Sequence, residues 1–219
     1  MATVFMDLDG TILEGNSGCL WASYEFFGGR LPFQQMLLAG YYLAKYKLIG
    51  SDIRPALEKA ILGLKGQDSS NFVWRTEAFF DKWVVPRLRE KAVQMVQFHC
   101  AQGDKVVLLT SSTRMLGEHV SRVLKLHGCV GTDLRVDDGG VFTGEVDGPL
   151  CFGEGKVLKA EEYLVGTGES IPETLFYTDS STDLPMLEAC GEPITVNPDR
   201  QLKRIALQRG WKVLDWAAL

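Results

Sequence analysis

The chain has 219 residues, of which 46% are hydrophobic and 23% are charged, enough for one substantial core plus an inserted segment. Its formal net charge is −5, whereas a general binder of nucleic-acid backbones would carry a basic surplus, so we expect no nucleic-acid partner. The sequence has five cysteines without a C-x-x-C pair, and no signal-peptide pattern at its N-terminus. Both features favour a reduced, cytoplasmic protein.

Apolar runs with few charges predict five strands of a parallel sheet. The expected strands lie at about 3–8, 105–110, 174–178, 193–197 and 211–216. Helical periodicity occupies the intervals between the later strands, in the stretches 85–103, 112–128, 156–166 and 182–191. This alternation of strands and helices predicts an α/β fold with a doubly wound parallel sheet.

Two segments interrupt the alternation. Residues 16–90 have helical periodicity but no convincing strand, which predicts a helical cap inserted into a core made of 1–15 and 91–219. Within the cap, the longest apolar stretch of 31–50 is only Met36 to Ala44, too short to span a membrane, so we expect a packed helix and no membrane association. The alternative for this segment is a helix on a membrane surface or a lid over an apolar substrate. The run VDDGGVFTGEVDG predicts a β-hairpin around Gly139-Gly140.

Polar residues follow three of the predicted strands where each strand ends. Asp7 and Asp9 are two apart, so on a strand they would point to the same side, where they repel each other unless a cation or proton lies between them. Hydroxyl residues end the second strand at 110–112, and 179–183 follow the third with two more aspartates. Parallel strands bring their carboxyl ends to one edge of a sheet, so we expect an all-oxygen site suited to Mg²⁺.

These residues, in this order, resemble the four motifs of the haloacid dehalogenase superfamily of phosphatases. The matching elements are D-x-D-G-T at 7–11, Thr110, Lys156 at the start of a later helix, and D-x-x-x-D at 179–183. The stretches around Lys156 and after Ser180 look most like the phosphoserine-phosphatase-like branch. The resemblance implies a Rossmann-like core with an inserted helical cap.

The resemblance also implies a role for each residue, and the chemistry of the side chains agrees with it. Asp7 would be the nucleophile, Asp9 the general acid and base, and Lys156 a fixed positive charge. The Asp7 and Asp179 carboxylates and the Asp9 carbonyl would hold Mg²⁺, with Asp183 behind them. The phosphate would lie against Gly10, Thr11, Thr110 and Ser111. We therefore expect Mg²⁺-dependent hydrolysis of a small phosphorylated metabolite through an aspartyl-phosphate.

The chain departs from the phosphoserine-phosphatase-like pattern at three positions. Asn16 stands nine residues after Asp7, where that branch typically has a glutamate that recognises the substrate amine. Gly10 stands where that branch often has serine, and Thr178 stands where a glycine often precedes the aspartate. Substrate selection therefore falls to the cap, whose candidate residues are Asn16 and Arg54, together with Arg30 and Arg75.

Three other functions fit part of the sequence. A phosphotransferase or mutase would use the same aspartyl-phosphate, and a non-enzymatic phosphate-binding module would share the fold. Cys129 and Arg135 have the spacing of a cysteine-dependent phosphatase loop, which requires a thiol of low pKa. Asp133 inside that loop would repel the phosphate, and the helix end expected just before Cys129 would raise the pKa of its thiol.

Overall fold

The computed structural model describes residues 1–34, 36–38, 40–41 and 54–217. The chain forms two compact units. The first contains Met1–Gly15, Arg87–Asp133 and Gly148–Leu219, and the second contains Asn16–Pro86 and Leu134–Asp147. The second unit thus combines most of the predicted helical insert with the hairpin segment, which the sequence analysis left in the core.

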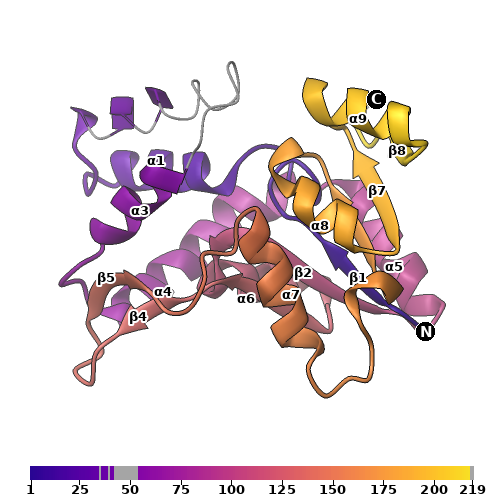
Figure 1. Cartoon of the computed structure of the whole chain (residues 1–219). Coiled ribbons are helices and arrows are strands. Elements are labelled where there is room, and N and C mark those ends of the chain that lie inside the picture. Colours follow the sequence, from indigo (N-terminus) through magenta and orange to yellow (C-terminus); the bar gives the residue numbers. More distant parts are fainter. Residues whose placement is uncertain (35, 39, 42–53, 218–219) are drawn as a thin grey trace. The chain divides into compact units, whose positions relative to one another are not determined.

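A six-stranded sheet lies at the centre of the first unit, in the order β3-β2-β1-β6-β7-β8 (Figure 1). Every neighbouring pair of strands runs parallel. The strands are β1 Thr3–Met6, β2 Lys105–Thr113, β3 Gly128–Thr132, β6 Leu175–Thr178, β7 Glu192–Val196 and β8 Lys212–Leu214. This sheet confirms the predicted α/β class with a doubly wound parallel sheet.

The strand β3 was not predicted, because the sequence pattern favours a helix as far as Gly128. The helix ends at Leu124, and Lys125 follows with a left-handed φ of 54°. The His127 N–H then donates to the Val106 carbonyl at 2.8 Å, which starts the pairing with β2. A five-residue strand with two glycines has little apolar patterning of its own, and its pairing with β2 is a long-range contact.

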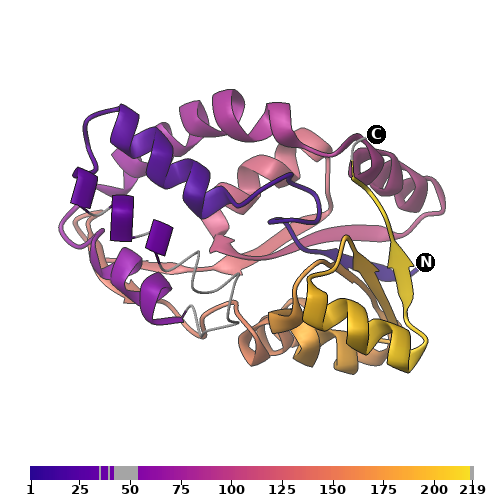
Figure 2. The same ribbon diagram turned by 90° about the horizontal axis from the view of Figure 1, so that it is seen from above.

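Helices cover both faces of the sheet. They are α5 Glu90–Ala101, α6 Arg114–Leu124, α7 Glu154–Leu164, α8 Leu184–Ala189 and α9 Arg200–Arg209. Figure 2 shows α5 and α6 on one face and α7, α8 and α9 on the other. The connections from β1 to β3 and from β6 to β8 proceed toward opposite edges of the sheet, and right-handed crossovers then place their helices on opposite faces.

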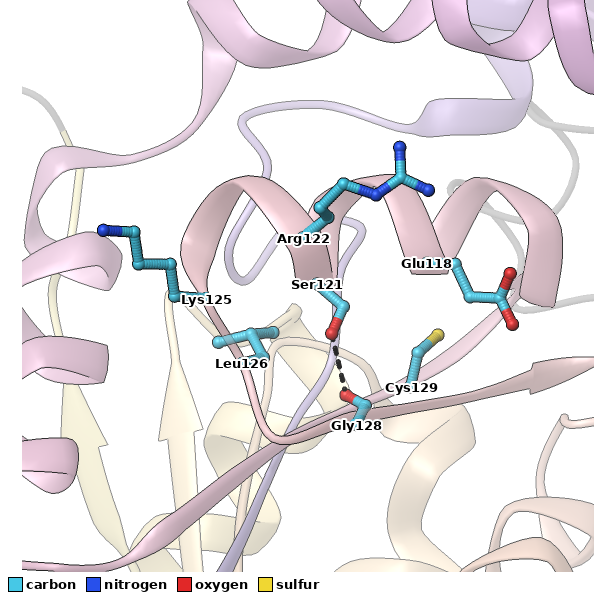
Figure 3. Close-up of a pocket in the computed structure, with 7 residues that line it drawn as sticks. All are labelled: Glu118, Ser121, Arg122, Lys125, Leu126, Gly128 and Cys129. Carbon is cyan, nitrogen blue, oxygen red and sulfur yellow. Dashed lines mark hydrogen bonds between the residues drawn. The ribbon is translucent and has the colours of Figure 1, made fainter.

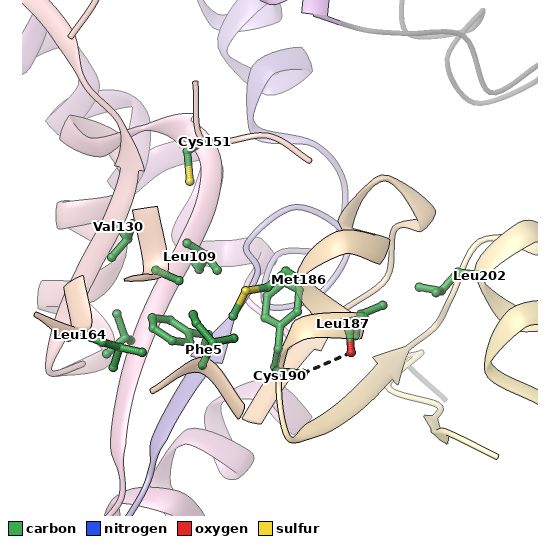
Figure 4. Packing of buried hydrophobic residues seen from close by; sticks show 13 residues of the cluster. Phe5, Leu109, Val130, Cys151, Leu164, Met186, Leu187, Cys190 and Leu202 are labelled. Carbon is green, nitrogen blue, oxygen red and sulfur yellow. Dashed lines mark hydrogen bonds between the residues drawn. The ribbon is translucent and has the colours of Figure 1, made fainter. Parts of the chain in front are cut away.

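The core between the sheet and α7, α8 and α9 is apolar and closely packed (Figure 4). Phe5, Val107 and Phe176 are paired neighbours on three adjacent strands and are fully buried. Because side chains alternate across a strand, residues two further along the same strands point toward α7 and α8 as well. This alternation governs where the side chains at the carboxyl ends of β1 and β6 point.

The second unit consists of helices and a small hairpin. Its helices are α1 Ser17–Phe27, α3 Arg54–Leu62, α4 Ser69–Phe79 and the π-helix η1 Phe80–Val84, and its strands are β4 Leu134–Val136 and β5 Phe142–Val146. The hairpin confirms the turn predicted at Gly139-Gly140. It belongs to this unit because the Gly66 N–H donates to the Phe142 carbonyl and the Phe142 N–H donates to the Gln67 carbonyl. Phe72 of α4 also packs against Phe142.

Packing within the second unit is largely aromatic. Trp21 of α1 lies between Phe72 and Phe79, with ring centroids 5.3 and 5.1 Å away. In the part of the chain that the structure describes, no helix is long and apolar enough to cross a membrane. Much of the predicted helical segment 31–50 lies outside the described residues, namely 35, 39 and 42–50.

A buried histidine joins α5 to the sheet. His99 Nδ1 lies 3.0 Å from Asp104 Oδ2, and its Nε2 lies 2.8 Å from the Tyr177 hydroxyl. The carboxylate can only accept, so Nδ1–H donates to Asp104. This hydrogen bond lowers the pKa of Asp104 more than burial raises it, and the hydrogen bond from the Ala2 N–H adds to the lowering, so the pKa of Asp104 lies below its ordinary value.

We expect Asp104→Asn to destabilise the protein at neutral pH and much less in acid. A lowered pKa in the folded state gives stability that is present above the ordinary carboxyl pKa and is lost as the pH falls through the lowered value. Urea unfolding between about pH 3 and pH 7 should therefore give variant and wild-type curves that converge toward the acid end. Asp138→Asn, at an exposed hairpin position, is the matched control. A difference in stability that does not vary with pH would contradict this account.

Candidate active site

Asp7 follows β1 directly and points toward the α7 face. It is two residues beyond Phe5, so alternation along the strand carries its side chain to the same side. The Asp7 N–H donates to the Tyr177 carbonyl at 2.9 Å, which continues the pairing of β1 with β6 by one residue. The Asp7 backbone is therefore held by the sheet, while the residue is only 6% exposed and its side chain lies among charged groups.

Lys156, in the first turn of α7, connects two of the predicted carboxylates. Its Nζ lies 2.6 Å from Asp7 Oδ1 and 2.7 Å from Asp183 Oδ2. Lys156 is 1% exposed and Asp183 is 2% exposed, so both ion pairs are inaccessible to water. Removing the lysine would leave these buried carboxylates without a compensating charge, which is strongly unfavourable.

The charges at this site shift its pKa values strongly. Burial raises the pKa of Asp7 to about 7; Lys156 opposes this shift, and Asp183 and Asp9 add to it. Burial alone would lower the pKa of Lys156, but the Asp183 and Asp7 carboxylates outweigh that effect and raise it above its ordinary value. Lys156 is therefore a permanent cation.

Asp179 lies immediately after β6 and has an oxygen without a partner. Its Oδ1 is buried and makes no hydrogen bond within the described part of the chain. Burial, followed by the charges of Asp7, Asp183 and Asp9, raises its pKa well above the ordinary value. Asp7, Asp179 and Asp183 thus share the charge of one lysine, and Asp9 is close enough to raise the pKa of Asp7 and Asp179. An unpartnered carboxylate oxygen among them fits a bound cation.

The predicted metal ligands form a small donor set. They comprise two carboxylates and one main-chain carbonyl, from Asp7, Asp179 and Asp9. No group of three or more His, Cys, Asp or Glu side chains among the described residues is arranged to hold a metal. A hard cation such as Mg²⁺ suits so few protein oxygens, because it keeps several of its own waters.

Gly10 differs from its predicted part in the site. Its N–H donates to the carbonyls of Leu13 and Gly15, at 3.0 and 2.9 Å. This N–H is therefore already hydrogen-bonded within its own loop and is not directed at a phosphate. A Cβ at this position would overlap the Asp179 carboxylate, and φ is +82°. Glycine is required here for close approach and left-handed backbone. Thr11 is fully buried, and its Oγ1 has no hydrogen-bond partner among the described residues.

Thr110 and Ser111 lie within β2, which extends to Thr113. The Thr110 Oγ1 accepts from the Ser112 N–H at 3.1 Å. The helix predicted from residue 112, just after Ser111, begins later: α6 starts at Arg114, and the Thr113 side chain caps it by accepting from the Leu116 N–H. Ser111 therefore lies in a strand and not at a helix start. Thr110 still follows the buried run of β2, in the strand next to β1.

The cap candidates are engaged in the folding of the second unit. Asn16 is the N-cap of α1, and its side chain accepts from the Cys19 N–H. The buried Glu25 pairs with both Arg30 and Arg75, each at 2.9 Å. Asn16, Arg30 and Arg75 therefore stabilise the fold of the second unit, a role that was not predicted for them. Arg54 lies at the exposed start of α3.

Cys129 lies in an environment unsuited to a catalytic thiolate. It is on β3, beside an open hollow of about 520 Å³ lined by α6 residues such as Glu118 and Arg122 (Figure 3). Burial, reinforced by Glu118, raises the pKa of its thiol to about 12. Arg135 belongs to the second unit, where it pairs with Glu145. A cysteine-dependent phosphatase loop is therefore contradicted.

Sequence reasoning missed Asp199, which fixes the loop after β6. Its N–H donates to the Asp179 carbonyl at 2.8 Å, and its Oδ2 accepts from the Ser181 N–H at 2.6 Å. Its Oδ1 caps α9 by accepting from the Leu202 N–H. The signal was the Asn-Pro-Asp run just before a helix, where aspartate is a preferred N-cap.

Comparisons with known proteins agree with this geometry. The chain is 27% identical over 219 residues to phosphoserine phosphatase SerB1 of Mycobacterium tuberculosis, covering 98% of this chain and 71% of that protein. It is 26% identical over 214 residues to a histidinol-phosphatase of Neisseria meningitidis, covering 96% of each. A solved structure from Bordetella pertussis, of unknown function, is 29% identical with a TM-score of 0.88, covering 99% of this chain and 100% of that one.

A family model described as haloacid dehalogenase-like hydrolase matches residues 4–188. The match extends from the start of β1 to α8, and therefore includes Asp7, Lys156, Asp179 and Asp183. The chain belongs to the haloacid dehalogenase-like hydrolase family.

Proposed function

We propose that the protein is a Mg²⁺-dependent phosphatase that hydrolyses a small phosphomonoester through a phosphorylated Asp7. The observation that carries the proposal is the buried Lys156 between Asp7 and Asp183, beside the unpartnered oxygen of Asp179. A buried cation fixed against a carboxylate at the end of a strand is suited to an anionic substrate and an anionic nucleophile. The relatives named phosphoserine phosphatase and histidinol-phosphatase support the reaction class.

The reaction has two displacements. An Asp7 oxygen attacks phosphorus, the bond from phosphorus to the substrate oxygen breaks, and the Asp9 carboxylic acid gives its proton to the departing oxygen. Asp9, now a carboxylate, takes a proton from water, whose oxygen attacks phosphorus and releases Asp7 and inorganic phosphate. Lys156 holds Oδ1 of Asp7, which leaves Oδ2 in the attacking role.

Mg²⁺ would be held by the carboxylates of Asp7 and Asp179 and by the Asp9 carbonyl. When bound, it offsets the repulsion between the carboxylates and the phosphate. Thr11 and Thr110 remain the proposed phosphate contacts, since both are buried at the carboxyl ends of β1 and β2. The cytoplasmic location and the role of 16–90 as a substrate-selecting cap stay predictions.

The substrate class follows from what the two named relatives have in common. Phosphoserine and histidinol phosphate are both phosphate esters of a primary alcohol with an amine on the neighbouring carbon. We propose a substrate of this kind. The side chains of Asn16, Glu25 and Arg75 have partners in the second unit, so the amine is recognised differently from the pattern in which a glutamate stands nine residues after the nucleophile.

A panel of phosphate esters assayed with Mg²⁺ tests the reaction and the substrate together. Phosphoserine, histidinol phosphate, sugar phosphates and lysophospholipids are supplied in parallel, with EDTA as the metal-free arm. We expect phosphate release that requires Mg²⁺ and is fastest with an amino-alcohol phosphate. Phosphate transfer to an added alcohol in preference to water would identify a phosphotransferase instead. Absence of turnover across the panel would count against any enzymatic function.

A further inference from the structure

Thr178, the last residue of β6, is buried beside the proposed catalytic groups. It is 0% exposed, and it is two residues beyond Phe176, so its side chain points toward α7 and α8 as that of Phe176 does. Its hydroxyl donates to Asp183 Oδ2 at 2.6 Å. A hydroxyl in this position would be unfavourable without such a partner, because a buried polar group needs a hydrogen bond.

The direction of the Thr178 hydroxyl proton follows from its second contact. The Ser180 N–H lies 3.3 Å from Thr178 Oγ1 and can only donate. The hydroxyl therefore accepts from Ser180, and its own proton is directed at Asp183. Asp183 Oδ2 therefore accepts two hydrogen bonds, one from the Thr178 hydroxyl and one from Lys156 Nζ, which lies 2.7 Å away.

These contacts form a continuous chain from Thr178 to the nucleophile. The Thr178 hydroxyl and Lys156 Nζ both donate to Asp183 Oδ2. Lys156 Nζ also donates to Asp7 Oδ1, at 2.6 Å. Without the hydroxyl, the Asp183 carboxylate could rotate about its last side-chain bond. The ammonium of Lys156 would then follow it, because a lysine side chain has several rotatable bonds.

We propose that Thr178 is a positioning residue for Lys156, acting through Asp183. The inference rests on the proposed function and extends it to a residue outside the predicted site. The β-branched side chain restricts Thr178 to few rotamers, which keeps its hydroxyl aimed at Asp183. Valine has nearly the same shape without the hydroxyl, and serine keeps the hydroxyl without the methyl group, so the two variants separate hydrogen bonding from packing.

Steady-state kinetics of Thr178→Val and Thr178→Ser test the role. A lost hydrogen bond to a charged group predicts a decrease in kcat of about 10- to 100-fold for the valine variant. KM should stay within about twofold, because the position of Lys156 matters most in the transition state. Serine should restore most of kcat. A valine variant with wild-type kcat, or a serine variant as slow as valine, would overturn the proposal.

A second measurement needs no turnover. In Mg²⁺-free protein labelled with ¹⁵N-lysine, the buried Lys156 ammonium should give a slowly exchanging resonance, assigned by its absence in Lys156→Met. We expect this resonance to shift or broaden in Thr178→Val and to return in Thr178→Ser; an unchanged resonance in the valine variant overturns the positioning role. If valine prevents folding, Thr178→Ala takes its place. Wild-type protein that hydrolyses no phosphate ester would refute the proposed function, and this spectrum would still decide the role of Thr178.

Discussion

Asp7→Asn will reduce phosphate release by at least about 10³-fold, as replacement of a covalent nucleophile does in other enzymes. The amide is a poor nucleophile and forms no acyl phosphate, while its size and one acceptor oxygen are kept, so the Lys156 contact at 2.6 Å survives. The variant should remain folded, since it removes one of several carboxylates that repel each other in this buried site. Initial rates with Mg²⁺ and the best substrate of the panel measure the effect.

The control for this variant is Cys129→Ser, which replaces the thiol of the alternative cysteine-dependent phosphatase loop. This substitution should leave the rate of phosphate release unchanged. Trapping gives an independent check: with beryllofluoride and Mg²⁺, wild-type protein should bind one acyl-phosphate mimic, seen by ¹⁹F NMR, and Asp7→Asn none. If Asp7→Asn kept substantial activity and Cys129→Ser had none, the nucleophile would be Cys129 and not Asp7.

The central sheet could be predicted because its signals are local and strong. Buried parallel strands such as β1 and β2 read as unbroken apolar runs, and helices such as α7 and α8 show helical periodicity close to their observed bounds. The strand β3 lacked such a run, and its pairing with β2, which begins with the hydrogen bond from the His127 N–H to the Val106 carbonyl, depends on residues about 20 positions away. Its existence therefore could not be read from the residues of β3 alone.

The acidic part of the candidate site was predicted from spacing and strand ends. Asp7 and Asp179 follow their strands directly, so the sheet itself brings them together. Hydrogen-bond partners were much less predictable. The engagement of the Gly10 N–H within its own loop, and that of Thr178 with Asp183, depend on atomic positions that no residue pattern specifies.

The cap residues show the same limit. Arginines and an asparagine in a helical segment suggest substrate contacts, yet Asn16 caps α1, and Arg75 pairs with Glu25 across 50 residues of sequence. A capping asparagine has the local pattern of a helix start, so its role could have been inferred. The pairing of Glu25 with Arg75 could not, because it depends on how α1 packs against α4.

Asp179→Asn will stabilise the metal-free protein at neutral pH and abolish its stabilisation by Mg²⁺. Burial, with the charges of Asp7, Asp183 and Asp9, raises the pKa of Asp179 in the folded state. A raised carboxyl pKa means that the folded state binds more protons than the unfolded state. Stability is therefore lost as the pH rises above the ordinary carboxyl value of 3.8 toward the raised one. Asparagine cannot ionise and escapes this loss.

Thermal unfolding of the EDTA-treated proteins gives the test. At neutral pH the variant should melt at least about 3 °C above wild type, and the difference should shrink toward about pH 4. Mg²⁺ at about 100 times its dissociation constant should stabilise wild type by about 2.7 kcal/mol and the variant hardly at all. Phosphate release should fall by about 10²-fold or more, because several kcal/mol of charge stabilisation is lost. Asp138→Asn, which removes an exposed carboxylate, should show none of these changes. A variant that melts below wild type in EDTA at neutral pH, or that still gains stability from Mg²⁺, would show that Asp179 is not a metal ligand placed under electrostatic repulsion.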